Sequence, residues 1–182
     1  MAQGATVYRA CLELAHVDRA QYAKIDLRVA RHPSETAERM LVRILAYAIR
    51  YEEGLAFGRG VSTPDEADLW SHEADGRVRQ WIFVGQPEGG RLLKAARQAE
   101  RVSVFAFGRG AEAWRESQFA ELDAPGNLGV CRIRDDFVEA LSAHLLRKIE
   151  WSVTLHAGML YLDDGARTLE TAPEPWWGDP LR

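Results

Sequence analysis

Strict alternation of apolar and polar residues opens the chain and repeats after a short polar turn. Side chains alternate across a β-strand with period two, so each segment predicts a half-buried strand. The turn at Asp18 and Arg19 joins them, and residues 1–31 are therefore expected to form an N-terminal β-hairpin. The apolar positions of the two segments are Tyr8, Ala10, Leu12 and Leu14, then Ala23, Ile25, Leu27 and Val29.

Helical periodicity follows this hairpin. On a wheel of roughly 100° per residue, one arc is apolar; its members are Leu41, Val42, Ile44, Leu45, Ala48 and Ile49. The pattern predicts a helix over residues 34–53, ending before Gly54. Either Pro33 takes the first helical position or Ser34 caps the helix.

Two carboxylates at this helix start conflict with its apolar arc. Glu38 points into the middle of the arc, and Glu35 lies at its edge. A buried carboxylate is costly unless a cation, a metal or backbone amides compensate it. The alternative is structural: Glu35 pairs with Arg39 one turn on, and Glu38 is only partly covered near the surface.

The remaining pattern predicts a mixed sheet with flanking helices, an α/β or α+β fold. From residue 34 to 107 the predicted order is αβββαβ. We expect one domain over 1–182, with a core at 32–109 between the hairpin and a C-terminal α/β extension at 110–182. The expected strands are 55–57, 67–71, 78–85, 102–107, 128–133 and two or three within 149–170; the further helices are 88–100, 111–122 and 135–148, and the tail from 171 is expected on the surface.

Charge is unevenly distributed along the 182 residues, whose net charge is −4. Residues 1–109 carry 16 basic and 14 acidic side chains, whereas 110–182 carry 7 and 13. A phosphate-binding surface would therefore belong to the first part. No apolar run is long enough to cross a bilayer and no leader pattern is present, so we expect a cytoplasmic protein without a membrane partner.

Metal-binding spacing is absent from the cysteines and histidines. Cys11 and Cys131 are isolated and the five histidines are scattered, which argues against a disulfide framework or a zinc site. The basic residues are 20 arginines and only 3 lysines, which draws attention to Lys94 because guanidinium cannot replace a compact ammonium everywhere. With Arg91, Gln98 and Arg101, Lys94 lies on one side of its predicted helix. This side is either a solvated basic face or a strip that contacts backbone phosphates.

Several motifs together resemble the YaeQ family, and the resemblance covers nearly the whole chain. They are Arg31-His32-Pro33-Ser34-Glu35-Thr36 with Glu38-Arg39-Met40, Asp65-Glu66 with Trp70, Trp81-Ile82 before Gly85-Gln86-Pro87, and Arg91 with Lys94-Ala95. The resemblance implies a variant of the PD-(D/E)XK nuclease-like fold, whose core is αβββαβ. Residues 32–109 would form that nuclease-like core.

The same resemblance implies a site for Mg²⁺ or Mn²⁺, which prefer oxygen ligands. Glu38 would be the helix carboxylate with Glu35 beside it, and Asp65 or Glu66 would be the acid from the sheet. Lys94 would supply the cation and Gln86 a carbonyl oxygen. The further binding residues are Ser34, Arg39, Trp70 and Arg91; Trp70 either covers the site or packs.

This chain departs from the nuclease pattern at two positions. Phe83 stands where related sequences often carry an acid, and Gly85 stands where the motif lysine would be. Three hypotheses remain: an inactive nuclease-like module that binds nucleic acid or protein, with nucleic acid contacted by residues 31–109; a Mg²⁺- or Mn²⁺-dependent phosphodiesterase or nuclease; and a buried Glu38–Lys94 ion pair that only stabilises the fold. A catalytic site requires Glu38, Asp65 or Glu66, and Lys94 to share one polar pocket.

Overall fold

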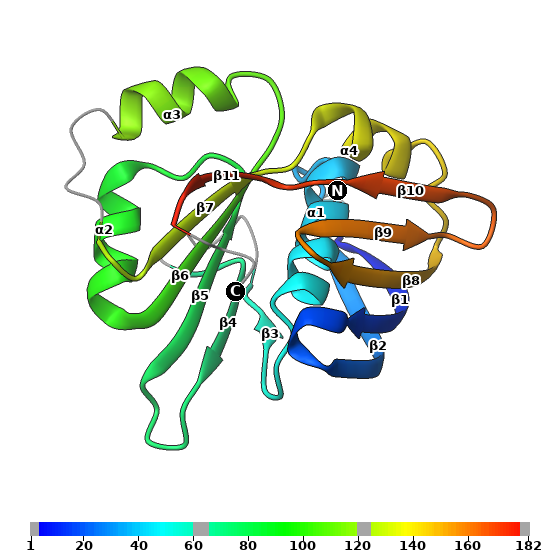
Figure 1. The fold of residues 1–182 in the computed structure, drawn as a ribbon, viewed down its shortest axis with the longest axis horizontal. Coiled ribbons are helices and arrows are strands. Elements are labelled where there is room, and N and C mark those ends of the chain that lie inside the picture. Colours follow the sequence, from blue (N-terminus) through cyan, green and yellow to red (C-terminus); the bar gives the residue numbers. More distant parts are fainter. Residues whose placement is uncertain (1–3, 60–65, 120–124, 179–182) are drawn as a thin grey trace. The chain divides into compact units, whose positions relative to one another are not determined.

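A computed structural model describes residues 4–59, 66–119 and 125–178 (Figure 1). The chain divides into two compact units: Met1–Arg50 with Asp136–Pro173, and Tyr51–Asp135 with Glu174–Arg182. Within the described residues there are four α-helices and two mixed sheets. The expected α+β class is confirmed, whereas a single domain over 1–182 stays a prediction.

The first unit contains a five-stranded sheet in the order β10-β9-β8-β1-β2. β1 and β2 pair antiparallel in continuous register, which confirms the hairpin, and β8 runs parallel to β1. The elements are β1 (Thr6–His16), a 3₁₀ turn (Val17–Arg19), β2 (Gln21–Arg31), α1 (Ala37–Ile49), α4 (Asp135–Ser142), β8 (Lys148–His156), β9 (Met159–Asp163) and β10 (Thr168–Thr171).

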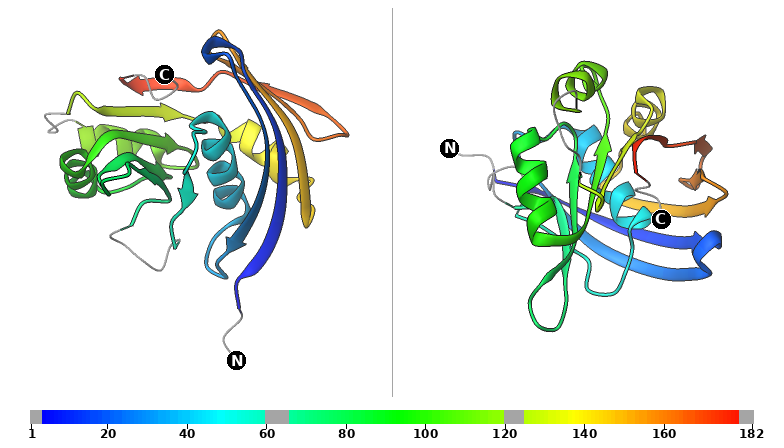
Figure 2. Two further views of the ribbon diagram at one scale, coloured as in Figure 1. Left: turned by 90° about the horizontal axis from the view of Figure 1, so that it is seen from below. Right: turned by 60° about the vertical axis from the view of Figure 1, so that its left-hand side comes forward.

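Burial in this sheet follows the predicted alternation. Leu12 and Val29 are buried on its inner face, while Glu13 and Arg28 are exposed on the other face. The sheet curves around α1, which lies on its concave side (Figure 2). Every residue of α1 from Met40 to Ile49 is buried, so this helix forms the centre of the unit's core.

The second unit contains a six-stranded sheet in the order β11-β7-β6-β5-β4-β3. β5, β6 and β7 run parallel to one another, and the remaining neighbours are antiparallel. The elements are β3 (Ala56–Phe57), β4 (Leu69–His72), β5 (Val78–Val84), α2 (Gly89–Gln98), β6 (Ala99–Ala106), α3 (Ala111–Phe119), β7 (Leu128–Arg132) and β11 (Glu174–Trp177).

One apolar cluster joins α2 to a face of this sheet. Trp81 and Phe83 of β5 belong to it together with Leu92 and Ala95 of α2. Because side chains alternate along a strand, Ile82 between them lies on the opposite face, where it is also buried. β5 is therefore apolar on both faces, as expected for a parallel strand in the middle of a sheet.

The predicted order αβββαβ between residues 34 and 107 is found, with differences at its ends. The first helix begins at Ala37 rather than 34, because Thr36 caps it: its Oγ1 accepts a hydrogen bond from the Arg39 amide at 3.2 Å. Beyond this stretch, the helix predicted over 135–148 ends at Ser142, six residues early.

The tail from 171 was expected on the surface, and Glu174, Pro175 and Trp177 are exposed there, but the strand β11 within it was not predicted. Residues Glu174–Trp177 pair antiparallel with β7, with a register shift between Pro175 and Trp177. Trp176 packs against the apolar cluster, while Trp177 is 43% exposed. Pairing with a strand about forty residues earlier leaves little local signal in so short a segment.

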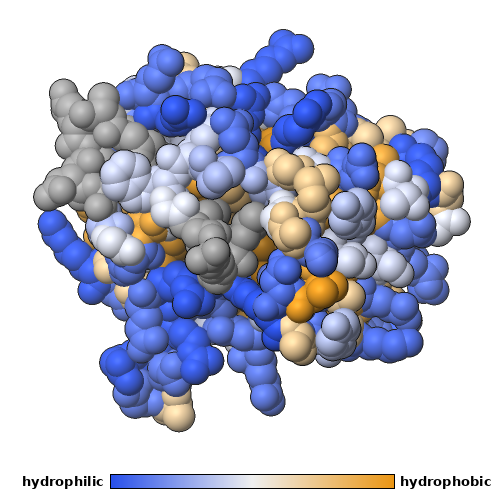
Figure 3. All heavy atoms as spheres, viewed as in Figure 1, coloured by the Kyte–Doolittle hydropathy of each residue, from blue (hydrophilic) through white to orange (hydrophobic). Residues whose placement is uncertain are grey.

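Hydrophilic residues predominate on the face drawn in Figure 3, with apolar residues scattered among them. Among the described residues no helix is both long enough and apolar enough to cross a membrane.

Candidate functional site

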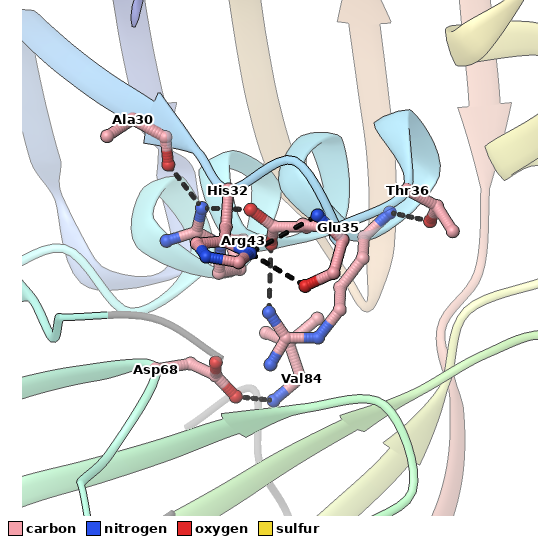
Figure 4. Close-up of polar contacts among 9 residues, drawn as sticks. Ala30, His32, Glu35, Thr36, Arg43, Asp68 and Val84 are labelled. Atoms are coloured by element: carbon pink, nitrogen blue, oxygen red, sulfur yellow. Dashed lines mark hydrogen bonds and ion pairs between the residues drawn. The ribbon is translucent and has the colours of Figure 1, made fainter. Parts of the chain in front are cut away.

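A buried carboxylate with two arginines marks the start of α1 in the first unit (Figure 4). Oε1 of Glu35 accepts hydrogen bonds from Arg39 Nη1 and Arg43 Nε, both at 2.8 Å. Its Oε2 accepts a bond from Arg43 Nη2 at 2.7 Å, and the same nitrogen donates to the Ala30 carbonyl oxygen at 2.9 Å. The side chains of Glu35 and Arg43 are only 2% and 3% exposed. Both carboxylate oxygens are thus held by guanidinium groups.

The buried acid is Glu35, which corrects the expectation that Glu38 points into the core. Because the helix begins at Ala37, Glu35 precedes it and is not on its wheel, so its side chain can lie against Arg39 and Arg43. Glu38 is only partly buried. The predicted Glu35–Arg39 pair is present, and Arg43 is the partner that sequence reasoning missed. Its spacing of four residues from Arg39 was the available signal.

Ser34 lies beside this cluster on the exposed segment before the helix. Its Oγ is 2.7 Å from His32 Nδ1, and its amide donates to the same ring nitrogen at 3.2 Å. Ser34 therefore orders the turn into the helix, while Thr36 is the cap.

Glu66 and Arg91 meet in the second unit. Glu66 Oε2 accepts the Arg59 amide at 3.0 Å, and its other oxygen is 3.5 Å from Arg59 Nε. Arg91 donates to the Glu66 carbonyl oxygen at 3.3 Å, and its guanidinium carbon lies 5.2 Å from the centre of the Phe83 ring. The carboxylate is held by donors of the segment after β3, and Arg91 covers the aromatic ring.

Asp68 is a buried acid that the sequence analysis did not select. Its Oδ2 accepts the Val84 amide at 2.7 Å, at the end of β5 (Figure 4). Its own amide donates to the Ile82 carbonyl, so Asp68 continues the pairing of the segment before β4 with β5. An acid between the buried residues Ala67 and Leu69 was the signal for such a role.

Trp70 packs rather than lining an open site. Its ring meets Trp81 edge-on with centroids 5.8 Å apart, and His72 at 5.1 Å. It lies against the apolar cluster that contains Phe83.

Gln86 links two loops that follow parallel strands. Its Nε2 donates to the carbonyl oxygens of Phe107 and Arg109, at 3.1 and 3.2 Å. The second loop contains the pentapeptide Ala-Phe-Gly-Arg-Gly, which occurs in the sequence at 56–60 and again at 106–110. Its Gly108 has φ +84° and donates its amide to Asp135 Oδ1 at 2.7 Å. The positive φ explains this glycine as a turn residue.

Glu35 and Glu66, two of the acids considered for a metal site, and the additional acid Asp68 have other partners in the structure. The carboxylates of Glu35, Glu66 and Asp68 each accept hydrogen bonds from protein nitrogens, and Phe83 is 2% exposed within the apolar cluster. Guanidinium groups on Glu35 make its surroundings unfavourable for a divalent cation. These three carboxylates therefore fit structural roles better than a Mg²⁺ or Mn²⁺ cage.

The predicted convergence of the site residues stays a prediction. Glu38 belongs to the first unit, and Lys94 is exposed on α2 in the second. Asp65 lies outside the described residues. In the described ranges no three or more histidine, cysteine or acidic side chains group as metal ligands.

Two mixed sheets with a buried acid–arginine cluster define a mixed α+β protein. Residues 1–173 match the family model described as YaeQ protein. The chain is 34% identical to the YaeQ protein of Escherichia coli K12 over 177 residues, covering 97% of this chain and 98% of that protein. The chain belongs to the YaeQ family.

Solved structures agree with this assignment. The YaeQ protein from Pseudomonas syringae superposes with a TM-score of 0.93 at 38% identity, covering 97% of this chain and 98% of that one. The YaeQ protein from Xanthomonas axonopodis pv. citri gives 0.90 at 34% identity, covering 94% and 98%. The family is thereby confirmed, while the nuclease-like variant of the fold stays a prediction.

Proposed function

We propose that the protein binds the sugar–phosphate backbone of nucleic acid through the cationic face of α2, and that it does so without cleaving it. The cationic face consists of Arg91, Lys94 and Arg97 of α2 with Arg101 at the start of β6. The observation that carries the proposal is that two arginines of this face, Arg97 and Arg101, form no ion pair within the described residues, whereas arginines elsewhere in the unit do.

Amphipathic packing orients this helix. Leu92 and Ala95 are buried in the apolar cluster, so Lys94 and Arg97 are left exposed, and Arg101 is exposed on the strand that follows. Residues Gly89–Gln98 contain no acidic side chain. A helix face with several cations and no anion suits the regular negative charge of a nucleic-acid backbone.

Two arginines, Arg77 directly before the neighbouring strand β5 and Arg79 within it, provide the contrast. Arg77 pairs with Asp75 at 2.7 Å and with Glu100 at 3.1 Å, and Arg79 pairs with Glu73 at 2.6 Å. Within the described ranges, no ion pair joins Arg97 or Arg101 to an acid. A phosphate contact at these two arginines would displace water and counterions only, not an existing carboxylate.

The surroundings of Phe83 and Glu35 disfavour cleavage. Phe83 cannot ligate a metal, and its place in the apolar cluster beneath Arg91 leaves no room for a charged ligand there. The Glu35 carboxylate is neutralised by two guanidinium groups. The alternative, a Mg²⁺- or Mn²⁺-dependent phosphodiesterase using Glu38, Asp65 or Glu66, Gln86 and Lys94, is a distinct outcome of the same experiment.

Fluorescence anisotropy with labelled single- and double-stranded DNA and RNA tests the proposal across a salt series. For duplex DNA, log K falls with log salt by about 0.9 for each phosphate neutralised. The variant Arg97→Gln/Arg101→Gln should therefore weaken binding and reduce that slope by about two contacts. The matched control, Arg77→Gln/Arg79→Gln, removes the same charge from ion-paired positions and should leave both quantities nearly unchanged.

Equal losses in the two double variants, or no binding at low salt, would contradict the proposal. Incubating each nucleic acid with the protein and Mn²⁺ or Mg²⁺ tests for cleavage. Cleavage that disappears in Glu38→Gln and in Lys94→Ala, with folding retained by circular dichroism, would establish the alternative instead.

A further inference from the structure

The four outer strands of the two sheets differ sharply in how they are protected. β3 has two residues and β10 has four; β11 has four, with Pro175 and a register shift. Short length, proline, bulges and charged side chains are the usual devices that prevent an edge from pairing with another chain. Three of the four edges use at least one of the first three.

β2 is the exception, and it is an edge strand of the five-stranded sheet. It has eleven residues, Gln21–Arg31, with no proline or glycine, and its pairing with β1 runs without a register shift. A long, regular edge presents a row of backbone donors and acceptors to a further strand. Its charged side chains are therefore decisive, because they determine which strand can pair there.

On the exposed face of β2 the order is Tyr22, Lys24, Asp26 and Arg28. In an antiparallel pair of two identical strands, a two-fold axis passes through one residue, and positions equally far from it lie opposite each other. An axis at Ile25 places Lys24 opposite Asp26 of the second copy, and Tyr22 opposite Arg28. Each favourable pair then occurs twice.

Neighbouring registers are worse. An axis at Lys24 or at Asp26 places that residue opposite its own copy, so that like charges meet directly. An axis at Leu27 pairs Asp26 with Arg28, but it also requires Ala30 to pair with the second copy. The carbonyl oxygen of Ala30 already accepts a hydrogen bond from Arg43. The register centred on Ile25 ends at Val29 and leaves Ala30 outside.

The inner face of β2 agrees with this register. Ala23 and Leu27 are only partly buried although both are apolar and lie on the core side of the strand. With the axis at Ile25, Ala23 of each copy lies opposite Leu27 of the other, so both become more fully covered. A second copy thus completes the apolar face of the sheet at its edge.

Charges already present along this face support the pairing. Lys24 Nζ is 2.8 Å from Glu13 Oε1, and Arg9 Nε donates to Asp26 Oδ1 at 3.1 Å. The hydrogen bond from Arg9 lowers the pKa of Asp26, and the hydrogen bond to Glu13 raises the pKa of Lys24, so both remain charged at neutral pH. Across the contact between the two copies, the side-chain charges alternate from strand to strand: Glu13 on β1 is negative, Lys24 on β2 is positive, and Asp26 on β2 of the second copy is negative.

We infer that two copies of this chain pair antiparallel along β2, with the two-fold axis at Ile25, and so form a continuous ten-stranded sheet. The inference is independent of the proposed nucleic-acid binding. Its occupant is a second copy because the charge pattern of β2 is complementary to itself in one register.

Sedimentation equilibrium on the full chain tests this. The mass should rise with concentration from 20.5 kDa toward twice that value. Lys24→Glu or Asp26→Lys alone places like charges opposite each other twice, and each should raise the dimer Kd roughly tenfold or more. The double variant Lys24→Glu/Asp26→Lys exchanges the signs and should return the Kd to near that of the wild type.

Lys148→Glu is the matched control, because Lys148 is exposed on β8 of the same sheet but away from the β2 edge. It should leave the Kd unchanged. Circular dichroism verifies folding of each variant, and the neutral Lys24→Gln gives an intermediate Kd with less risk to folding. A mass of 20.5 kDa at every soluble concentration overturns the inference, even if β2 accepts a strand from another protein. The inference is also overturned if neither Lys24→Glu nor Asp26→Lys changes the dimer Kd, or if the double variant does not return the Kd to near that of the wild type.

Discussion

Removing the Glu35 carboxylate should destabilise the protein strongly. In Glu35→Leu, Arg43 keeps its hydrogen bond to the Ala30 carbonyl but loses both bonds to a carboxylate, although its side chain is only 3% exposed. Breaking a buried ion pair by removing one partner costs about 3–5 kcal/mol, because the remaining charge stays buried and uncompensated. Arg39 contributes less, since its side chain is 23% exposed and can turn to water.

A double-mutant cycle separates the interaction free energy of Glu35 with Arg43 from the contribution that each side chain makes to other contacts. Replacing both partners, in Glu35→Leu/Arg43→Met, leaves no buried charge of this pair, and such replacements are often nearly neutral. The double variant should therefore lose less stability than Glu35→Leu alone. The coupling free energy should be at least as large as the difference between Glu35→Leu and the double variant, about 3 kcal/mol or more.

Urea unfolding followed by far-UV circular dichroism measures these free energies, with separate transitions fitted if the two units unfold apart. Glu38→Leu is the control at the same helix start; because Glu38 is only partly buried, it should cost less than about 1 kcal/mol. Additive effects of the two single substitutions, or equal losses for Glu35→Leu and Glu38→Leu, would refute the role of Glu35 as the buried partner of Arg43.

Two further predictions concern the same unit. Thr36→Ala should cost about 1 kcal/mol in urea unfolding, because the Arg39 amide loses its side-chain acceptor, whereas Thr36→Ser should retain most of that stability; equal losses would exclude the cap. For Asp164, burial alone would raise the pKa, but hydrogen bonds from Arg167 and from the amides of Ala166 and Arg167 outweigh it and lower the pKa below the usual 3.8. A lowered pKa in the folded state stabilises the protein above the ordinary value, and this stabilisation is lost as the pH falls through the folded-state pKa. The unfolding free energies of wild type and Asp164→Asn should therefore differ at neutral pH and converge below about pH 4; a difference independent of pH would contradict this.

Much of the fold could be predicted because its signals are local. Alternation from Tyr8 to Leu14 defines β1, and the Asp75-Gly76 turn, with φ +87° at Gly76, joins β4 to β5. β11 could not be predicted in the same way. It is four residues long, contains Pro175, and exists because β7 offers an edge, which only the folded unit reveals.

The buried acid was misplaced by a difference of a few residues in the helix start. Ser34 and Thr36 are both good caps, and local sequence does not decide between them. The wheel for a helix from 34 also treated Glu35 as a helical residue. The angle of Glu38 on the wheel is the same for either start; Glu38 is only partly buried because it lies in the first turn of α1. With Thr36 as the cap, Glu35 lies before the helix and is held by Arg39 and Arg43.

Phe83 shows why the catalytic part of the site could not be settled by motif alone. Sequence reasoning treated position 83 as a ligand position that had lost its acid. The structure gives the same position a packing role: Phe83 shares an apolar cluster with Trp81, Leu92 and Ala95, and Arg91 lies over its ring. An acid here would be buried among these apolar side chains, at a cost that a bound cation would have to offset. Position 83 cannot both ligate a metal ion and pack as an apolar residue. The burial of Phe83 therefore weighs against catalysis independently of where Glu38 and Lys94 lie.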